Sequence, residues 1–138
     1  MRTITVFDTT RHHIYLRCRL LTSNYESLGF VGILDTGASK TELSTLFLIS
    51  AKILKVEQMK PRNIRTHQET QKIGKIVLPT VEICGQTLSN FEIFVSQFDS
   101  SWGGIDALIG LDFFRYFRVT IDYSKGEILT EKFIDKTR

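Results

Sequence analysis

An apolar run, Leu28–Leu34, ends directly in Asp35, Thr36 and Gly37. A short run of this kind is typical of a strand that is buried on both faces. The aspartate therefore follows a buried strand and has no obvious basic partner, in a position where an isolated charge is costly. Because Asp and Gly also favour turns, a plain structural turn is the alternative interpretation. The apolar context favours a chemical role for Asp35.

Strand-like segments dominate the rest of the chain. The predicted strands, besides Leu28–Leu34, are Ile4–Phe7, Ile14–Leu21, Ile76–Cys84, Phe91–Phe98, Ala107–Ile109, Arg118–Tyr123 and Glu127–Phe133. Ile76–Cys84 and Phe91–Phe98 are expected to form a hairpin across Gly85-Gln86-Thr87. Helical spacing predicts a helix over Thr41–Leu54, capped by Thr41 or Ser44, and a short one over Leu111–Phe117. We therefore predict an all-β (mainly β) protein with one domain spanning residues 1–138.

Basic residues gather in the middle of the chain, although the net charge is only +3. They are Lys52, Lys55, Lys60, Arg62 and Arg65. Nucleic-acid surfaces usually interleave such charge with aromatic residues, and no aromatic residue occurs among these positions. We therefore predict a solvated surface and no nucleic-acid partner. The longest apolar runs, near Leu28–Leu34 and Leu46–Ile49, are too short to span a bilayer, so no membrane partner is predicted.

The cysteines and histidines show no metal-binding pattern. Cys18 and Cys84 are neither a close pair nor spaced as metal ligands, and both lie in apolar-alternating segments. We therefore expect buried, reduced thiols and a cytoplasmic protein. The N-terminus lacks the apolar stretch of a signal peptide. His12 and His13 would face opposite ways on a strand and have no evident third ligand, so neither a metal nor a cofactor is predicted.

Two separated segments together carry a family resemblance. The first is Leu34–Ser39 and the second, far downstream, is Ala107–Phe113. In this order they resemble the paired signatures of the retropepsin-like aspartic proteases of retroviruses, retroelements and bacteria, which are Asp-Thr/Ser-Gly-Ala/Ser and apolar-apolar-Gly. The resemblance extends from about Ile14 to Phe133. It implies a closed acid-protease barrel with a short helix in its C-terminal half and one additional helix after the catalytic loop.

The resemblance also implies roles for individual residues. Asp35 is the expected catalytic aspartate, Thr36 hydrogen-bonds the partner's equivalent loop, and Gly37 binds substrate and orients the carboxylate. The segment Leu108–Gly110 is expected to pass beside this loop. The polar stretch Ile64–Ile76 falls where the family has its flap, a hairpin that closes over bound peptide. The substrate-binding residues predicted on this basis are Ala38, Ser39, Thr66, His67, Gln68, Leu108 and Ile109.

The proposed chemistry needs two carboxylates, and the sequence supplies one. Peptide hydrolysis of this type uses two carboxylates that lie a few ångströms apart and share one proton. The ionised one takes a proton from water, and the protonated one donates to the substrate carbonyl. No second Asp-Thr/Ser-Gly occurs, and the chain has about half the length of a two-lobed enzyme. A homodimer is predicted, because both copies of Asp35 then meet at the two-fold axis.

The sequence departs from the viral pattern at two positions. Many viral members have an acidic residue soon after the motif's alanine and an arginine after apolar-apolar-Gly, which form an ion pair; Ser39 and Leu111 stand there in this chain. Ala38, in place of serine, implies an activity optimum nearer neutral pH. A second hypothesis is a catalytically weak or inactive dimerisation or peptide-binding module, because fold alone does not decide activity. The intact motif at Asp35 favours an active aspartic endopeptidase.

Overall fold

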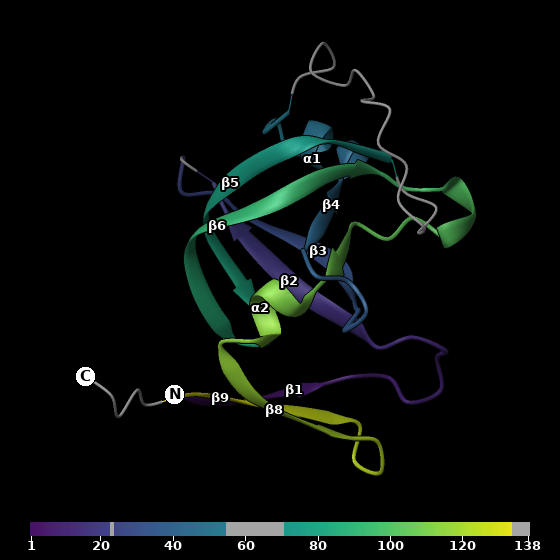
Figure 1. Ribbon diagram of the computed structural model, residues 1–138, viewed down its shortest axis with the longest axis vertical. Helices are drawn as coiled ribbons and strands as arrows, with labels where there is room; N and C mark the ends of the chain where they lie inside the picture. Colours follow the sequence, from purple (N-terminus) through teal and green to yellow (C-terminus); the bar gives the residue numbers. More distant parts are fainter. Residues whose placement is uncertain (23, 55–70, 134–138) are drawn as a thin grey trace.

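The computed structural model describes residues 1–22, 24–54 and 71–133. Within them, six strands close into a barrel in the order β2-β3-β7-β4-β6-β5, and three more form a separate sheet in the order β1-β9-β8 (Figure 1). The barrel strands are β2 (Tyr15–Leu21), β3 (Ser27–Leu34), β4 (Glu42–Ser44), β5 (Gln71–Ile83), β6 (Gln86–Gln97) and β7 (Ala107–Ile109). The separate sheet, called the terminal sheet below, contains β1 (Arg2–Val6), β8 (Phe117–Asp122) and β9 (Glu127–Lys132). The predicted mainly β fold with a closed barrel is confirmed.

Alternating side chains on the barrel strands fill its interior. On β2, Leu16, Cys18 and Leu20 are buried, whereas Arg17 and Arg19 between them are exposed. This period of two places one face of the strand against the core and the other in solvent. Each fully buried leucine contributes roughly 1.5–3 kcal/mol relative to an exposed one. The buried face of β2 therefore accounts for a substantial part of the stability that holds the barrel closed.

The longest strands, β5 and β6, form the predicted hairpin with a tighter turn than expected. The turn is the pair Cys84-Gly85, with φ values of 51° and 72°, and Ile83 pairs directly with Gln86. Two consecutive residues with positive φ are typical of a type I′ turn, whose twist matches that of the flanking strands. The predicted connection across Gly85-Gln86-Thr87 is therefore misplaced, because the turn begins at Cys84 and both Gln86 and Thr87 already belong to β6.

The prediction that Leu28–Leu34 is buried on both faces is wrong. In β3, Phe30 and Gly32 are buried, but Val31 between them is 38% exposed. No second layer covers the outer face of β3 at this position in the described structure. Phe30 on the inner face packs into the core, and pairing with β2 and β7 gives the backbone of β3 its hydrogen-bond partners.

The helix predicted over Thr41–Leu54 is shorter and starts later. Its first residues form β4, which pairs with β6 and β7, and only α1 (Thr45–Ser50) is helical. The Ser44 side chain accepts a hydrogen bond of 3.2 Å from the Leu46 N–H, which confirms Ser44 rather than Thr41 as the cap. Long-range strand pairing therefore overrides the local helical spacing at the start of this segment.

A second short helix connects the barrel to the terminal sheet. This helix, α2 (Leu111–Phe114), lies within the predicted segment Leu111–Phe117, and Phe113 is fully buried in the core. The terminal sheet is joined to the barrel hairpin through Gln86, whose amide donates to the main-chain oxygens of Met1 (3.2 Å) and Thr130 (3.4 Å). The three strands predicted at the ends of the chain are confirmed.

The predicted buried state of the cysteines is confirmed, and the two adjacent histidines lie at the surface. Cys18 and Cys84 are free and buried. His12 and His13 precede β2 rather than belonging to a strand, and their ring centroids lie 4.8 Å apart edge to face. Both side chains are exposed. In the described residues no helix has the length and apolar character needed to cross a membrane.

Candidate active site

Asp35 stands at the first position after β3 and begins a seven-residue loop, called the aspartate loop, that ends at Thr41. Its N–H donates to the Ile109 carbonyl at 2.9 Å, which extends the pairing of β3 with β7 by one residue. One carboxylate oxygen, Oδ1, accepts from the Gly37 N–H at 3.0 Å, and the Ala38 N–H donates to the Asp35 carbonyl at 3.2 Å. These bonds fix the carboxylate at the end of a barrel strand.

The middle of the aspartate loop is accessible to solvent, apart from Ala38. Asp35 is half-buried, whereas Thr36, Gly37 and Ser39 are exposed, and Ala38 is only 6% exposed. Gly37 does not adopt a positive φ. Its role is close approach, since a Cβ there would lie 3.2 Å from the Asp35 Oδ1. The absence of a side chain at Gly37 therefore lets its backbone N–H approach the Asp35 carboxylate.

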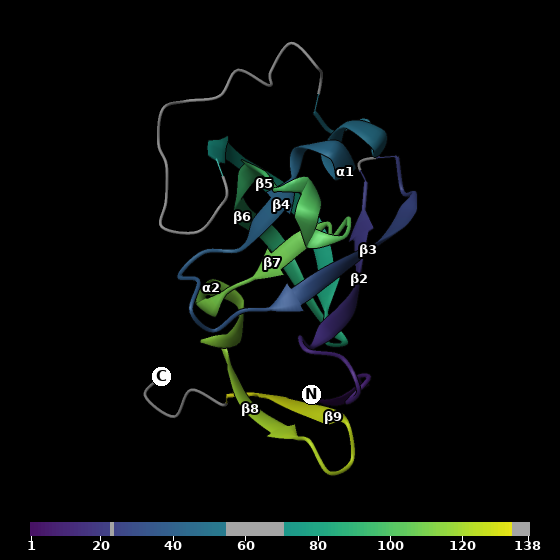
Figure 2. The same cartoon turned by 90° about the vertical axis from the view of Figure 1, so that its right-hand side faces the viewer.

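The segment Leu108–Gly110 passes directly beside the aspartate loop (Figure 2). β7 runs parallel to β3, with Leu34 opposite Ile109, and the Leu111 N–H donates to the Ala38 carbonyl at 2.8 Å. A Cβ on Gly110 would lie 2.7 Å from the Ala38 carbonyl oxygen. Only glycine therefore allows the two segments to approach this closely.

The two predicted substrate contacts on β7 point to opposite sides of the sheet. Ile109 is fully buried in the barrel core, with Leu34 as its neighbour on the same face. Leu108 pairs with Ile33 and with Glu42, and these three residues lie on the opposite face, where Leu108 (5% exposed) and Glu42 (2% exposed) are also buried. The prediction of a substrate contact therefore does not fit Ile109, whose neighbours are core side chains. Leu108 remains a candidate, on the strand next to the one that carries Asp35.

The predicted flap contacts Thr66, His67 and Gln68 lie outside the residues that the structure describes. The aspartate loop, with Asp35, Thr36, Gly37, Ala38 and Ser39, is described completely. The structure places the two sequence signatures, Leu34–Ser39 and Ala107–Phe113, side by side.

Thr41 and Asp112 form a contact at the end of the aspartate loop that the sequence did not predict. Asp112 lies in the first turn of α2. Its carboxylate also accepts two hydrogen bonds from Thr41. No local pattern predicts this contact, because the two residues are 71 positions apart in the chain.

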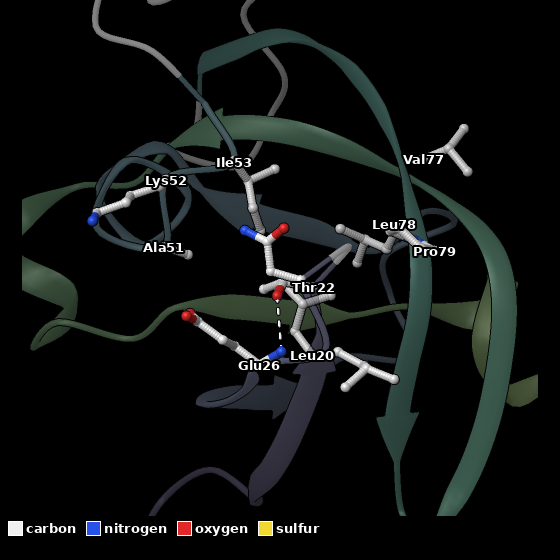
Figure 3. Close-up of a pocket in the computed structure, with 11 residues that line it drawn as sticks. Leu20, Thr22, Glu26, Ala51, Lys52, Ile53, Val77, Leu78 and Pro79 are labelled. Carbon is white, nitrogen blue, oxygen red and sulfur yellow. Dashed lines mark hydrogen bonds between the residues drawn. The ribbon is translucent and has the colours of Figure 1, made fainter.

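A separate cavity of about 410 Å³ lies elsewhere on the barrel (Figure 3). It is lined by residues at the end of β2, after α1 and on β5, including Leu20, Ile53 and Val77. Leu20 pairs with Leu28 at the start of β3, whereas Asp35 follows the end of that strand. The chain advances by seven residues from Leu28 to Asp35, which is about 23 Å along an extended strand. The cavity is therefore not part of the site around Asp35.

Comparison with known proteins gave consistent matches. A family model described as "gag-polyprotein putative aspartyl protease" matches residues 27–116. A retropepsin-like aspartic protease from Rickettsia conorii has a TM-score of 0.63 and 20% sequence identity, over 94% of this chain and 89% of that chain. The retroviral protease-like domain of Ddi1 from Leishmania major has a TM-score of 0.58 and 14% identity, over 91% of this chain and 98% of that chain. No curated protein matched the sequence.

Proposed function

The chain belongs to the gag-polyprotein aspartyl protease family, and from this premise we propose that it is a homodimeric aspartic endopeptidase. Two copies of Asp35, one from each subunit, hold the attacking water between them. One carboxylate is ionised and takes a proton from this water, while the other is protonated and donates to the carbonyl oxygen of the peptide. The intermediate then breaks down as the first carboxyl gives its new proton to the leaving amine nitrogen and the second carboxylate takes a proton from a hydroxyl of the intermediate. The C–N bond breaks, and the pair is left with one shared proton as before.

The observation that carries the proposal is the way in which the Asp35 carboxylate is held. It is fixed by the Gly37 N–H at the end of a barrel strand, and Thr36 and Ser39 in the same loop are exposed. An aspartate that served only to form a turn would not require its backbone N–H to pair with a second strand, whereas the Asp35 N–H donates to the Ile109 carbonyl on β7. The exposed Thr36 hydroxyl is our proposed contact to the equivalent loop of the second copy.

The other described aspartates already serve as structural hydrogen-bond acceptors. Asp8, Asp99 and Asp122 each accept from residues two or three positions later, and Asp106 and Asp112 accept backbone N–H groups from across the barrel. Within the described residues, none of these five lies on a second loop of the Asp35 type. Since the mechanism needs two carboxylates, the second is proposed to come from another copy of the chain.

We propose an extended peptide as the substrate. The candidate contacts are Gly37, Ala38 and Ser39 in the aspartate loop and Leu108 on the neighbouring strand, together with Thr66, His67 and Gln68. Ala38 contributes through its backbone, because its side chain is buried. The free thiols Cys18 and Cys84 support a reducing compartment, and we propose the cytoplasm.

The test is to assay wild type and Asp35→Asn on a broad mixture of peptides. Wild type is expected to cleave and the variant is not. Mixing the two proteins after subunit exchange tests the shared site: at equal amounts, about a quarter of randomly assorted dimers carry two Asp35 residues, so activity should fall to about a quarter of that of pure wild type. A fall to one half would show that each chain works alone. Absence of cleavage by wild type, with dimers present in sedimentation, would instead support the non-catalytic binding module.

A further inference from the structure

The end of the aspartate loop is held by a carboxylate from another part of the chain. The Asp112 carboxylate accepts the Thr41 backbone N–H at 2.9 Å through Oδ2 and the Thr41 hydroxyl at 2.7 Å through Oδ1. Thr41 is fully buried. Hydrogen bonds to an ionised acceptor are shorter and roughly twice as strong as neutral ones. This two-point contact therefore fixes both the backbone and the side chain of Thr41.

The Thr41 hydroxyl also connects Asp112 to Gly110. While it donates to Asp112, its oxygen accepts the Gly110 N–H at 3.0 Å. A hydroxyl that donates to a carboxylate becomes a better acceptor, so the two bonds strengthen each other. The carboxylate thus acts on the same turn whose glycine contacts the Ala38 carbonyl.

The aspartate loop is attached to the segment 109–112 along its whole length. At its start, the Asp35 N–H donates to Ile109, and in its middle, Ala38 accepts from the Leu111 N–H. At its end, Thr41 is held by Asp112. Of these attachments, the one through Asp112 is the only one made by a side chain of the segment 109–112.

We propose that Asp112 is a positioning residue for catalysis, which acts through Thr41 on the geometry of the Asp35 carboxylate. The inference rests on the proposed function. Because both ends of a short loop are anchored to one rigid segment, loosening Thr41 frees the turn that carries the Asp35–Gly37 hydrogen bond. A displacement of reacting groups by about 1 Å can cost about 100-fold in rate. Asp112 touches neither the substrate nor the water in this proposal.

A purely structural role for Asp112 makes a different prediction. An acidic residue in the first turn of a helix stabilises that helix, and its loss would lower stability without changing turnover in the folded dimer. The chain offers a matched control in Asp106, which is likewise half-buried, flanks the other end of β7, and accepts the Val31 N–H at 2.9 Å. Val31 lies four residues before Asp35, outside the aspartate loop.

The decisive comparison is between Asp112→Asn and Asp106→Asn in the full chain. Asparagine has almost the same shape as aspartate. Its amide group, however, places N–H donors next to the Thr41 N–H and hydroxyl, both of which are donors themselves. We expect Asp112→Asn to lower kcat about 10- to 100-fold with KM changed less than about threefold, and Asp106→Asn to leave kcat unchanged. Rates are normalised to folded dimer. Equal kcat for the two variants would overturn the proposal.

Thr41 supplies a second, independent pair of variants. Thr41→Ser keeps the hydroxyl and is expected to retain most of the wild-type kcat. Thr41→Val has nearly the same shape without the hydroxyl, and it leaves the Gly110 N–H without its acceptor. It is expected to lower kcat as Asp112→Asn does. A kcat for Thr41→Val equal to that of Thr41→Ser would also overturn the proposal.

A measurement without turnover separates this inference from the proposed function. The Gly37 N–H reports the geometry at Asp35 directly, because it donates to the Asp35 Oδ1. Its amide resonance should shift in Asp112→Asn and stay in place in Asp106→Asn, whether or not the protein cleaves peptides. An unshifted Gly37 amide in Asp112→Asn would refute the positioning role. Lack of cleavage by wild type would refute the endopeptidase and leave the positioning role to be judged by this shift.

Discussion

Gly110 is the residue whose substitution tests the tertiary arrangement of the site most directly. A Cβ at this position would lie 2.7 Å from the Ala38 carbonyl oxygen and 2.8 Å and 2.9 Å from the carbonyl carbon and oxygen of Lys40. All three atoms belong to the backbone, so no side chain can rotate away. To restore an ordinary contact of 3.4 Å, the aspartate loop has to move by about 0.7 Å, close to the displacement of about 1 Å that can cost 100-fold in rate.

Gly110→Ala is therefore expected to lower both stability and activity. Overpacking of this kind costs about 1–3 kcal/mol, and the loop displacement is expected to reduce kcat/KM by roughly 10- to 100-fold. Urea unfolding and steady-state kinetics on the purified protein measure the two effects. Gly29→Ala is the matched control, since a Cβ on Gly29 would meet only the Cys18 carbonyl oxygen at 3.9 Å. If Gly110→Ala and Gly29→Ala had the same stability and activity, the argument from close approach would be wrong.

Three further outcomes follow from the fold. Burial raises the pKa of Cys84 to about 11 and also raises that of Cys18. Because the folded state favours the neutral thiols, this contribution to stability is present below the ordinary thiol pKa of 9.0 and is lost as pH rises toward 11. Urea unfolding at several alkaline pH values will show the loss. Ser44→Ala removes the cap of α1 and should cost about 1 kcal/mol in urea unfolding, whereas no loss would mean that the cap does not contribute. Phe113→Ala empties a fully buried site and should cost about 3–5 kcal/mol, measured as a lower Tm and urea midpoint, with a cost below 1 kcal/mol contradicting the packing.

The parts of the fold that depend on local chemistry were predictable from the sequence. Alternation of apolar and polar residues predicts β2 and the terminal strands, because a strand with one buried face has a period of two. The cap at Ser44 was one of two predicted candidates, since a hydroxyl one residue before a helix satisfies a backbone N–H. Where the outcome depended on distant partners, prediction failed: β4 replaced the first turn of the expected helix because it pairs with β6 and β7.

The features of the candidate site also fall into two groups, those predictable from the sequence and those that depend on the tertiary structure. The sequence by itself determined that a carboxylate followed by Thr36 and Gly37 stands at the end of an apolar strand, because strand and turn preferences act between neighbouring residues. Only the tertiary structure decided which side chains surround it. The pairing of β3 with β7 turns Ile109 into the core and Leu108 to the opposite face, and it brings Asp112 to Thr41. Such contacts depend on the close approach of segments about 70 residues apart, which no local pattern encodes.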